Sequence, residues 1–186
     1  ENSIGDISVT TGTGSEIAVT AHKTAWGSTQ AEADAALAAL KVNITQDGNA
    51  VTVRFEQISE VLIVGQRRDD SVDFTITVPV TTTVTAHTNF GEVNLAGTRS
   101  GADLQTNYGA IRASDLQGGA LHLQSDFGSV TLEDSTAASV EARTSSGGIA
   151  LVRVEAEADV TLNSDFGMIE FDHGRAGSLA AQTNNG

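Results

Sequence analysis

One short phrase recurs through the second half of the chain. It consists of threonine or serine, a small polar residue, usually an aromatic residue, glycine, any residue, and valine or isoleucine. Its glycines are separated by 18, 19, 19, 20 and 19 residues: Gly91, Gly109, Gly128, Gly147, Gly167 and Gly186. A repeat of this length is typical of solenoids, in which each unit buries its apolar face only by stacking on its neighbours.

Apolar and polar residues alternate on both sides of each glycine. Around Gly109, for example, Ala102 and Leu104 precede the glycine and Ile111 and Ala113 follow it, with polar residues between them. A period of two is that of a half-buried strand. The sequence therefore predicts an all-β fold, a single-stranded β-helix or β-solenoid whose coils of about 19 residues each contain two strands that meet at a corner.

The corner has a second constant feature, a hydroxyl three residues before the glycine. The residues concerned are Thr88, Thr106, Ser125, Thr144, Ser164 and Thr183. Their parity places them inside the coil, where we expect them to bond backbone groups of the turn. We also expect the corner glycines Gly91, Gly109, Gly128, Gly147 and Gly167 to adopt a positive φ, which a residue with a Cβ disfavours.

The residue directly before the glycine is aromatic in four repeats: Phe90, Tyr108, Phe127 and Phe166. With coils about 4.8 Å apart, these rings would form a ladder, interrupted by Ser146. One interpretation is a structural stack that lines a corner. The other is an exposed strip that binds a sugar polymer or a hydrophobic partner.

Residues 1–80 depart from this regularity, and residues 81–186 follow it. We expect one domain over residues 1–186, with irregular N-terminal coils. A first coil is predicted around Gly5, which Ile7 and Val9 follow at the same offsets as in the repeats. A second strand, with Ile17, Val19 and Ala21, follows a turn.

A short helix is predicted over residues 29–40. Thr29 is the expected N-cap, with Glu32 completing a capping box, and Ala33, Leu37 and Leu40 form a narrow apolar stripe. An open solenoid end needs a cover against edge pairing. We therefore expect this helix to pack across or beside the coils as a cap.

Further strands are predicted between the helix and the repeats. Residues 41–46 and 50–56 alternate around Asp47-Gly48-Asn49, which indicates a hairpin. Residues 61–64 form a short apolar segment, and residues 72–78 alternate again up to Pro79. The loop predicted over residues 65–71 carries a charge cluster that we interpret as solvated: Arg67, Arg68, Asp69 and Asp70.

No catalytic or cofactor motif is recognised. The histidines His22, His87, His122 and His173 are dispersed, without the spacing of a zinc site. Nucleophile elbows, phosphate-binding glycine loops and dinucleotide fingerprints are missing from the sequence. We expect no enzymatic activity, no catalytic residue and no cofactor.

A calcium site between stacked acidic turns would need Asp126 and Asp165 as ligands. They are two coils apart, about 10 Å, with Ser145 between them. This placement favours avoidance of stacked like charges, so no metal site is predicted.

The composition narrows the range of partners. The formal charge is −14, which disfavours nucleic acid and anionic membranes as partners. There is no cysteine and no apolar run of membrane-spanning length, so we expect neither disulfides nor direct membrane insertion. Because the chain begins at Glu1 and stops within a repeat at Gly186, we expect a trimmed segment.

A family resemblance follows from three sequence elements. They are the T-N-x-G-x-[VI]-x-L unit, the segment F-T-I-T-V-P at 74–79, and an N-terminal G-x-I-x-V strand followed by an insertion. Together they resemble the bacterial adhesin-like domain of unknown function, a β-solenoid-like repeat family of cell-envelope and secreted proteins. The resemblance covers nearly the whole chain and implies a non-enzymatic, extracytoplasmic domain.

Three functions are open at this point. The first is a structural or adhesive envelope module that presents an acidic, regular β surface to a cell-surface protein or glycan. The second is a glycan-binding or glycan-active β-helix protein, although the outward positions do not converge on a pair of acids. The third is self-assembly through the unpaired ends of the solenoid.

Overall fold

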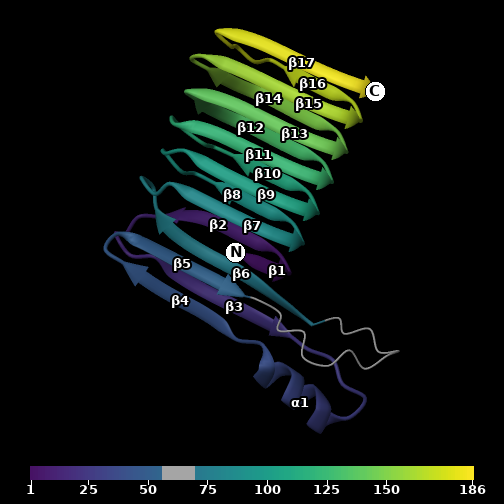
Figure 1. Ribbon diagram of the computed structural model, residues 1–186. Coiled ribbons are helices and arrows are strands. Elements are labelled where there is room, and N and C mark those ends of the chain that lie inside the picture. The colour runs from purple at the N-terminus through teal and green to yellow at the C-terminus, as the bar shows by residue number, and fades with distance from the viewer. Residues whose placement is uncertain (56–69) are drawn as a thin grey trace.

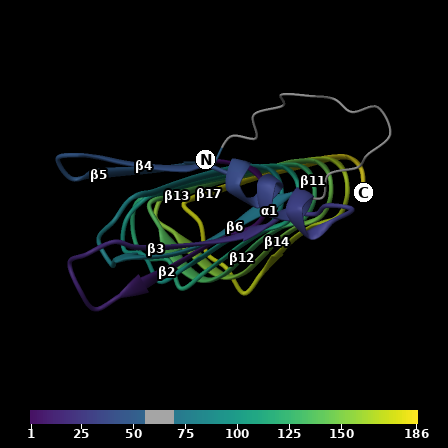
Figure 2. The same cartoon turned by 90° about the horizontal axis from the view of Figure 1, so that it is seen from below.

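A computed structural model describes residues 1–55 and 70–186, and it confirms the predicted β-solenoid. The strands form two sheets that face each other across one core (Figures 1 and 2). Sheet A has the order β17-β15-β13-β11-β9-β7-β1-β5-β4, and sheet B has the order β16-β14-β12-β10-β8-β2-β6-β3.

The elements follow the chain in this order: β1 (Asn2–Ile4), β2 (Ile7–Gly12), β3 (Ala18–Thr24), α1 (Gln30–Ala39), β4 (Val42–Asp47), β5 (Ala50–Phe55), β6 (Ser71–Pro79), β7 (Val84–Phe90), β8 (Val93–Ala96), β9 (Ala102–Tyr108), β10 (Ile111–Ser114), β11 (Ala120–Phe127), β12 (Val130–Ala137), β13 (Ser139–Ser146), β14 (Ile149–Ala156), β15 (Asp159–Phe166), β16 (Ile169–Asp172) and β17 (Ser178–Asn185).

Each regular coil contributes one strand to each sheet, joined at the corner glycine. Pairing between coils is parallel, and the register follows the repeat: Leu121 lies opposite Ala102 on one side and opposite Val140 on the other. Like positions therefore stack along the solenoid axis, as the 19-residue spacing predicts.

The alternating apolar positions fill the space between the sheets. Leu104, Leu123 and Leu162 of sheet A and Leu132 and Leu151 of sheet B are fully buried. Burial of each such side chain contributes about 1.5–3 kcal/mol. The same alternation in β17 is exposed, because β17 is the outermost strand of sheet A and has a neighbour on one side only.

The corner glycines stack directly on one another, but the predicted positive φ is wrong for most of them. Gly91 has a φ of 152°, whereas Gly109, Gly128, Gly147 and Gly167 lie outside the left-handed region. Glycine is required there because a Cβ on each would lie well inside 3.0 Å of the carbonyl oxygen of the previous corner glycine. The constraint is thus the close approach of two backbones rather than a local dihedral angle.

The hydroxyls three residues before the glycines point inward, as predicted. Each donates a hydrogen bond to the corner carbonyl of the preceding coil. Thr106 Oγ1 donates to the Gly91 oxygen at 2.9 Å, and Ser125 Oγ donates to the Gly109 oxygen at 2.9 Å. The contact is repeated up to Thr183 and Gly167. This hydroxyl column links neighbouring coils and satisfies carbonyls that the core would otherwise leave unpaired.

A second column of unusual backbone conformation lies six residues after the corner glycines. Its members all have positive φ: Gly97 (87°), Asp115 (55°), Asp134 (48°), Arg153 (54°) and His173 (50°). Sequence analysis missed this column, because its residue types differ from coil to coil.

The first coil stacks directly on the regular array although some 70 residues separate them in the chain. Asn2 of β1 lies opposite Thr88 of β7, and Ile7 of β2 lies opposite Val93 of β8. The intervening segment adds its strands on the other side of this coil, so β5 and β6 follow β1 and β2 outward.

The predicted hairpin is confirmed. Strands β4 and β5 are antiparallel, with Asp47 opposite Ala50 and Gly48 at a φ of 57°. Strand β3 pairs antiparallel with β6, so both outermost strands at this end run against the direction of their parallel neighbours.

The predicted helix is present as α1, at the N-terminal end of the stack beyond β3 and β4 (Figures 1 and 2). Thr29 is its N-cap, and its Oγ1 accepts a hydrogen bond from the Glu32 N–H. The predicted stripe is wrong at Leu37, which is 41% exposed, whereas Ala36 and Leu40 are buried. Leu40, the C-cap of α1, joins the main core, whereas Ala36 is buried outside that core.

Part of the predicted charged loop lies outside the described residues. This applies to the strand predicted over 61–64 and to Arg67, Arg68 and Asp69. Asp70 is described and is buried, which corrects its assignment to a solvated loop. Its Oδ1 accepts a hydrogen bond from the backbone N–H of Trp26 at 3.2 Å, tying the start of β6 to the segment before α1.

Candidate functional site

The rings predicted to form a strip lie along the glycine corner and are about half exposed: Phe90 (50%), Tyr108 (49%), Phe127 (52%) and Phe166 (60%). Phe90 and Tyr108 stack with centroids 4.9 Å apart and planes 4° apart. Tyr108 and Phe127 repeat this arrangement at 4.9 Å and 5°. We call these four residues the ring ladder. It combines the predicted stacking with the exposure that the binding interpretation requires.

The ring ladder is interrupted in one coil. Ser146 lies opposite Phe166 in the strand register, and Gly147 and Gly148 follow it. Beyond this break, Phe166 and the 70% exposed Met168 flank Gly167. The sequence shows the break directly, since S-S-G-G replaces the aromatic residue and its neighbours.

A shallow polar depression of about 320 Å³ lies beside this break on the outer face of sheet A. Its outward-facing lining residues are Gln124, Asp126, Arg143, Ser145, Asn163 and Asp165. The guanidinium of Arg143 is paired with Glu141, and Asp165 Oδ1 accepts a hydrogen bond from the Asn184 side-chain amide at 2.9 Å. Sequence analysis placed Asp126 and Asp165 correctly on two coils separated by Ser145, but did not predict the depression.

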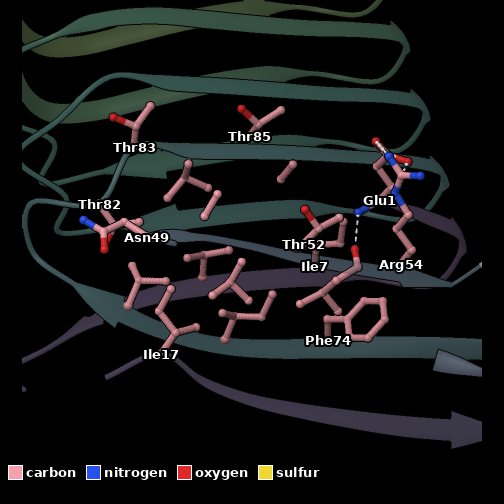
Figure 3. A pocket seen from close by; sticks show the side chains of 18 residues that line it. Glu1, Ile7, Ile17, Asn49, Thr52, Arg54, Phe74, Thr82, Thr83 and Thr85 are labelled. Carbon is pink, nitrogen blue, oxygen red and sulfur yellow. Dashed lines mark hydrogen bonds and ion pairs between the residues drawn. The ribbon is translucent and has the colours of Figure 1, made fainter. Parts of the chain in front are cut away.

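A second opening of about 330 Å³ lies between β5 and β7, where β1 covers only the last positions of the strand (Figure 3). Ile7, Phe74 and Ile76 form part of its apolar floor. Among the described residues that line it, Glu1 and Arg54 have ionisable side chains, and they form an ion pair at 3.1 Å.

The amino group of Glu1 lies at the end of this opening. It donates a hydrogen bond to the Val53 oxygen at 2.8 Å (Figure 3). Burial lowers the pKa of this amino group.

Two histidines form ion pairs with neighbouring carboxylates on the outside of the solenoid. His122 Nδ1 lies 3.2 Å from Glu141, and His173 Nδ1 lies 2.7 Å from Asp172. Over residues 1–55 and 70–186, no group of three or more potential ligands that could hold a metal ion is found. Within those same residues, no helix is long and apolar enough to cross a membrane.

The column of positive-φ residues from Gly97 to His173 contains an ion pair with two hydrogen bonds. Arg153 Nε lies 2.5 Å from Asp134 Oδ1, and a second guanidinium nitrogen lies 2.7 Å from Oδ2. The hydrogen bonds from Arg153 lower the pKa of Asp134, and the same contact raises the pKa of Arg153. This exposed pair links two neighbouring coils.

Comparison with known proteins identifies the family of this chain. Searches of curated proteins and of solved structures gave no match. The family model described as Toastrack DUF4097 matches residues 2–186. The repeated coils, the stacked corner glycines and this match over almost the whole chain agree: the protein belongs to the Toastrack DUF4097 family.

Proposed function

We propose that the protein is a non-enzymatic structural and adhesion module that displays the ring ladder to a partner on a bacterial cell envelope or outside the cell. The observation that carries this proposal is a regular row of half-exposed rings on a rigid corner. Large exposed aromatic side chains are uncommon unless they contact something, and they are enriched where proteins bind.

The scaffold explains why such a surface would bind well. The rings are held at 4.9 Å spacing by strand pairing and by contact with one another, so little side-chain freedom is left to lose on binding. The corner glycines hold the backbone below them at one spacing from coil to coil. Binding energy would therefore not be spent on ordering the surface.

The test is attachment of the purified protein to bacterial cell surfaces and to an array of glycans. Tyr108→Ala removes the middle of the three stacked rings, and we expect it to reduce attachment by about tenfold or more. Trp26→Ala is the matched control, because Trp26 is 59% exposed but lies outside the ring ladder. Equal attachment by both variants would contradict the proposal.

Glycan binding without cleavage is a second candidate. It is favoured by the amide and hydroxyl groups beside the rings, in particular Gln124, Ser145 and Asn163. Retaining or inverting cleavage requires two carboxyl groups converging on one bond, and Asp126 and Asp165 are separated by a full coil on an open face. Array signals with intact glycans would support this candidate, and release of shortened products would contradict its non-enzymatic part.

A further inference from the structure

Where Ser146 replaces an aromatic residue, the ring ladder has a gap wide enough for one planar group between two rings. Consecutive rings are 4.9 Å apart, so one missing ring leaves Phe127 and Phe166 two spacings apart, about 10 Å. Ser146 at the floor of this gap has a short side chain, and Gly147 and Gly148 have none. We call the space bounded by Phe127, Ser146 and Phe166 the Ser146 gap.

The geometry of the ladder determines what the gap presents. Phe127 stacks on Tyr108 with one face, and its planes are nearly parallel to those of Tyr108, so its other face is turned toward Ser146. A flat group midway between Phe127 and Phe166 would lie about 5 Å from each ring. That distance is within the range of stacked rings and of cation–π contacts.

The charges beside the gap favour a cation. Asp126 and Asp165 directly precede the two rings in sequence and line the depression next to the gap. Asp126 has no hydrogen-bond or ion-pair partner within the described residues, and the one cation of the depression, Arg143, is already paired with Glu141. The formal charge of −14 acts in the same direction over a longer range.

We propose that the Ser146 gap accepts the guanidinium group of an arginine side chain from a partner polypeptide. A guanidinium is planar, stacks on aromatic faces and pairs with carboxylates, so it uses both the ring walls and Asp126 or Asp165. A lysine ammonium is compact and more strongly hydrated, and a neutral sugar ring can donate hydrogen bonds to the carboxylates but forms no ion pair with them. This inference rests on the proposed function, and it deepens it by naming the group that the ladder recognises.

The test uses the 186-residue chain and a small probe, the tripeptide acetyl-Gly-Arg-Gly-amide, at about 0.15 M salt, where long-range attraction is screened. Tripeptides with lysine or with citrulline in place of arginine are the matched controls, and citrulline keeps the shape without the charge. Proton NMR follows the arginine side chain, whose methylene signals shift upfield between two rings. We expect binding and an upfield shift for arginine, at least about threefold weaker binding for lysine, and neither for citrulline.

Ser146→Phe is the decisive variant, because it places a ring in the gap and completes the ladder without changing the charge. We expect it to weaken arginine binding by about tenfold and to remove the upfield shift. Phe166→Ala removes one wall instead of filling the gap, and we expect it to weaken binding several-fold. Trp26→Ala removes a 59% exposed ring that lies outside the ring ladder, and it is expected to leave binding within about twofold of the unaltered protein.

Arginine binding that survives both Ser146→Phe and Phe166→Ala, or equal shifts for arginine and citrulline, would overturn the inference. Binding of maltohexaose that Ser146→Phe abolishes, in the absence of arginine binding, would also overturn it and would assign the gap to a sugar ring. The proposed function can survive such a result, since loss of cell-surface attachment in Tyr108→Ala is measured separately. If attachment does not depend on Tyr108 while arginine binding depends on Ser146, the proposed function fails and the gap stands as a separate site.

Discussion

The regular coils from β7 to β17 and the N-terminal excursion from β3 to β5 build the same two sheets in different ways. In the regular coils every strand lies beside the equivalent strand of the next repeat, in parallel and in one register. In the excursion, β4 and β5 form a local antiparallel hairpin, and α1 with its C-cap contributes only Ala36 and Leu40 to buried positions. The comparison shows that the array is stabilised by parallel contacts that every coil shares, whereas β3 and β4 of the excursion are held by antiparallel pairings with β6 and β5 that the regular coils lack.

The largest expected difference concerns glycine. Gly147→Ala places a Cβ against the Gly128 carbonyl, which belongs to backbone that cannot move without separating two coils. We expect a loss of about 4 kcal/mol or more, or failure to fold. Gly48→Ala in the hairpin meets open space and suffers only from its φ of 57°, which costs about 1–2 kcal/mol. Urea unfolding measures both, and equal losses would refute the stacking explanation.

A second prediction compares two leucines. Leu132→Ala empties a fully buried position between the sheets, and we expect a loss of about 2–5 kcal/mol. Leu37→Ala removes a side chain that is substantially exposed on α1, so its loss should stay within about 0.5 kcal/mol. A similar shift in the urea midpoint for the two variants would mean that α1 is a more integral part of the core than its burial indicates.

A third prediction compares two threonine hydroxyls. Thr106→Val keeps the shape of the side chain but removes the donor to the Gly91 carbonyl, with an expected cost of about 1–3 kcal/mol in global stability. Thr29→Ala removes the N-cap of α1, with an expected cost of about 1 kcal/mol confined to the helix. Amide hydrogen exchange separates the outcomes: Thr106→Val should accelerate exchange in the coils, and Thr29→Ala only in residues 30–39. Faster exchange throughout the chain in Thr29→Ala would show that the helix governs global stability.

The smallest expected effect concerns Asp134. Its pKa is lowered from the usual 3.8 mainly by the hydrogen bond from Arg153. The pair therefore stabilises the fold above that value, and this stabilisation disappears as the pH falls through the lower folded-state pKa. Asp134→Asn should lower the Tm slightly at neutral pH, and the difference should vanish in strong acid. A Tm difference that persists unchanged to about pH 2 would assign the effect to something other than this ion pair.

Much of the array could be predicted because its signals are local and repeated. The alternation around Gly109, repeated five times, identifies inward and outward positions without knowledge of any distant contact. The hydroxyl before each glycine was assigned to the inside by parity alone, and the structure confirms it. The rings Phe90, Tyr108 and Phe127 were expected to stack, and they do so at 4.9 Å.

Other features escaped prediction because they depend on contacts between segments far apart in the chain. The corner glycines have to lack a Cβ because of the neighbouring coil, and a positive φ was the local explanation that the sequence suggested. Leu37 was assigned to the buried stripe because helical spacing does not show which neighbours the helix meets. The positive φ shared by the column from Gly97 to His173 was not predicted, because its glycine, aspartates, arginine and histidine have no common sequence signal.

The sequence by itself determined the repeat length, the inward side of the strands in the regular coils and the row of rings at the corner, because these follow from periodicities that each coil carries within itself. The tertiary structure alone decided that the first coil is paired with β7 and β8, that the excursion lies beyond it, and that a polar depression opens beside the break at Ser146. The physical reason is that pairing between distant strands, and the space left by a small residue, exist only once the coils are stacked.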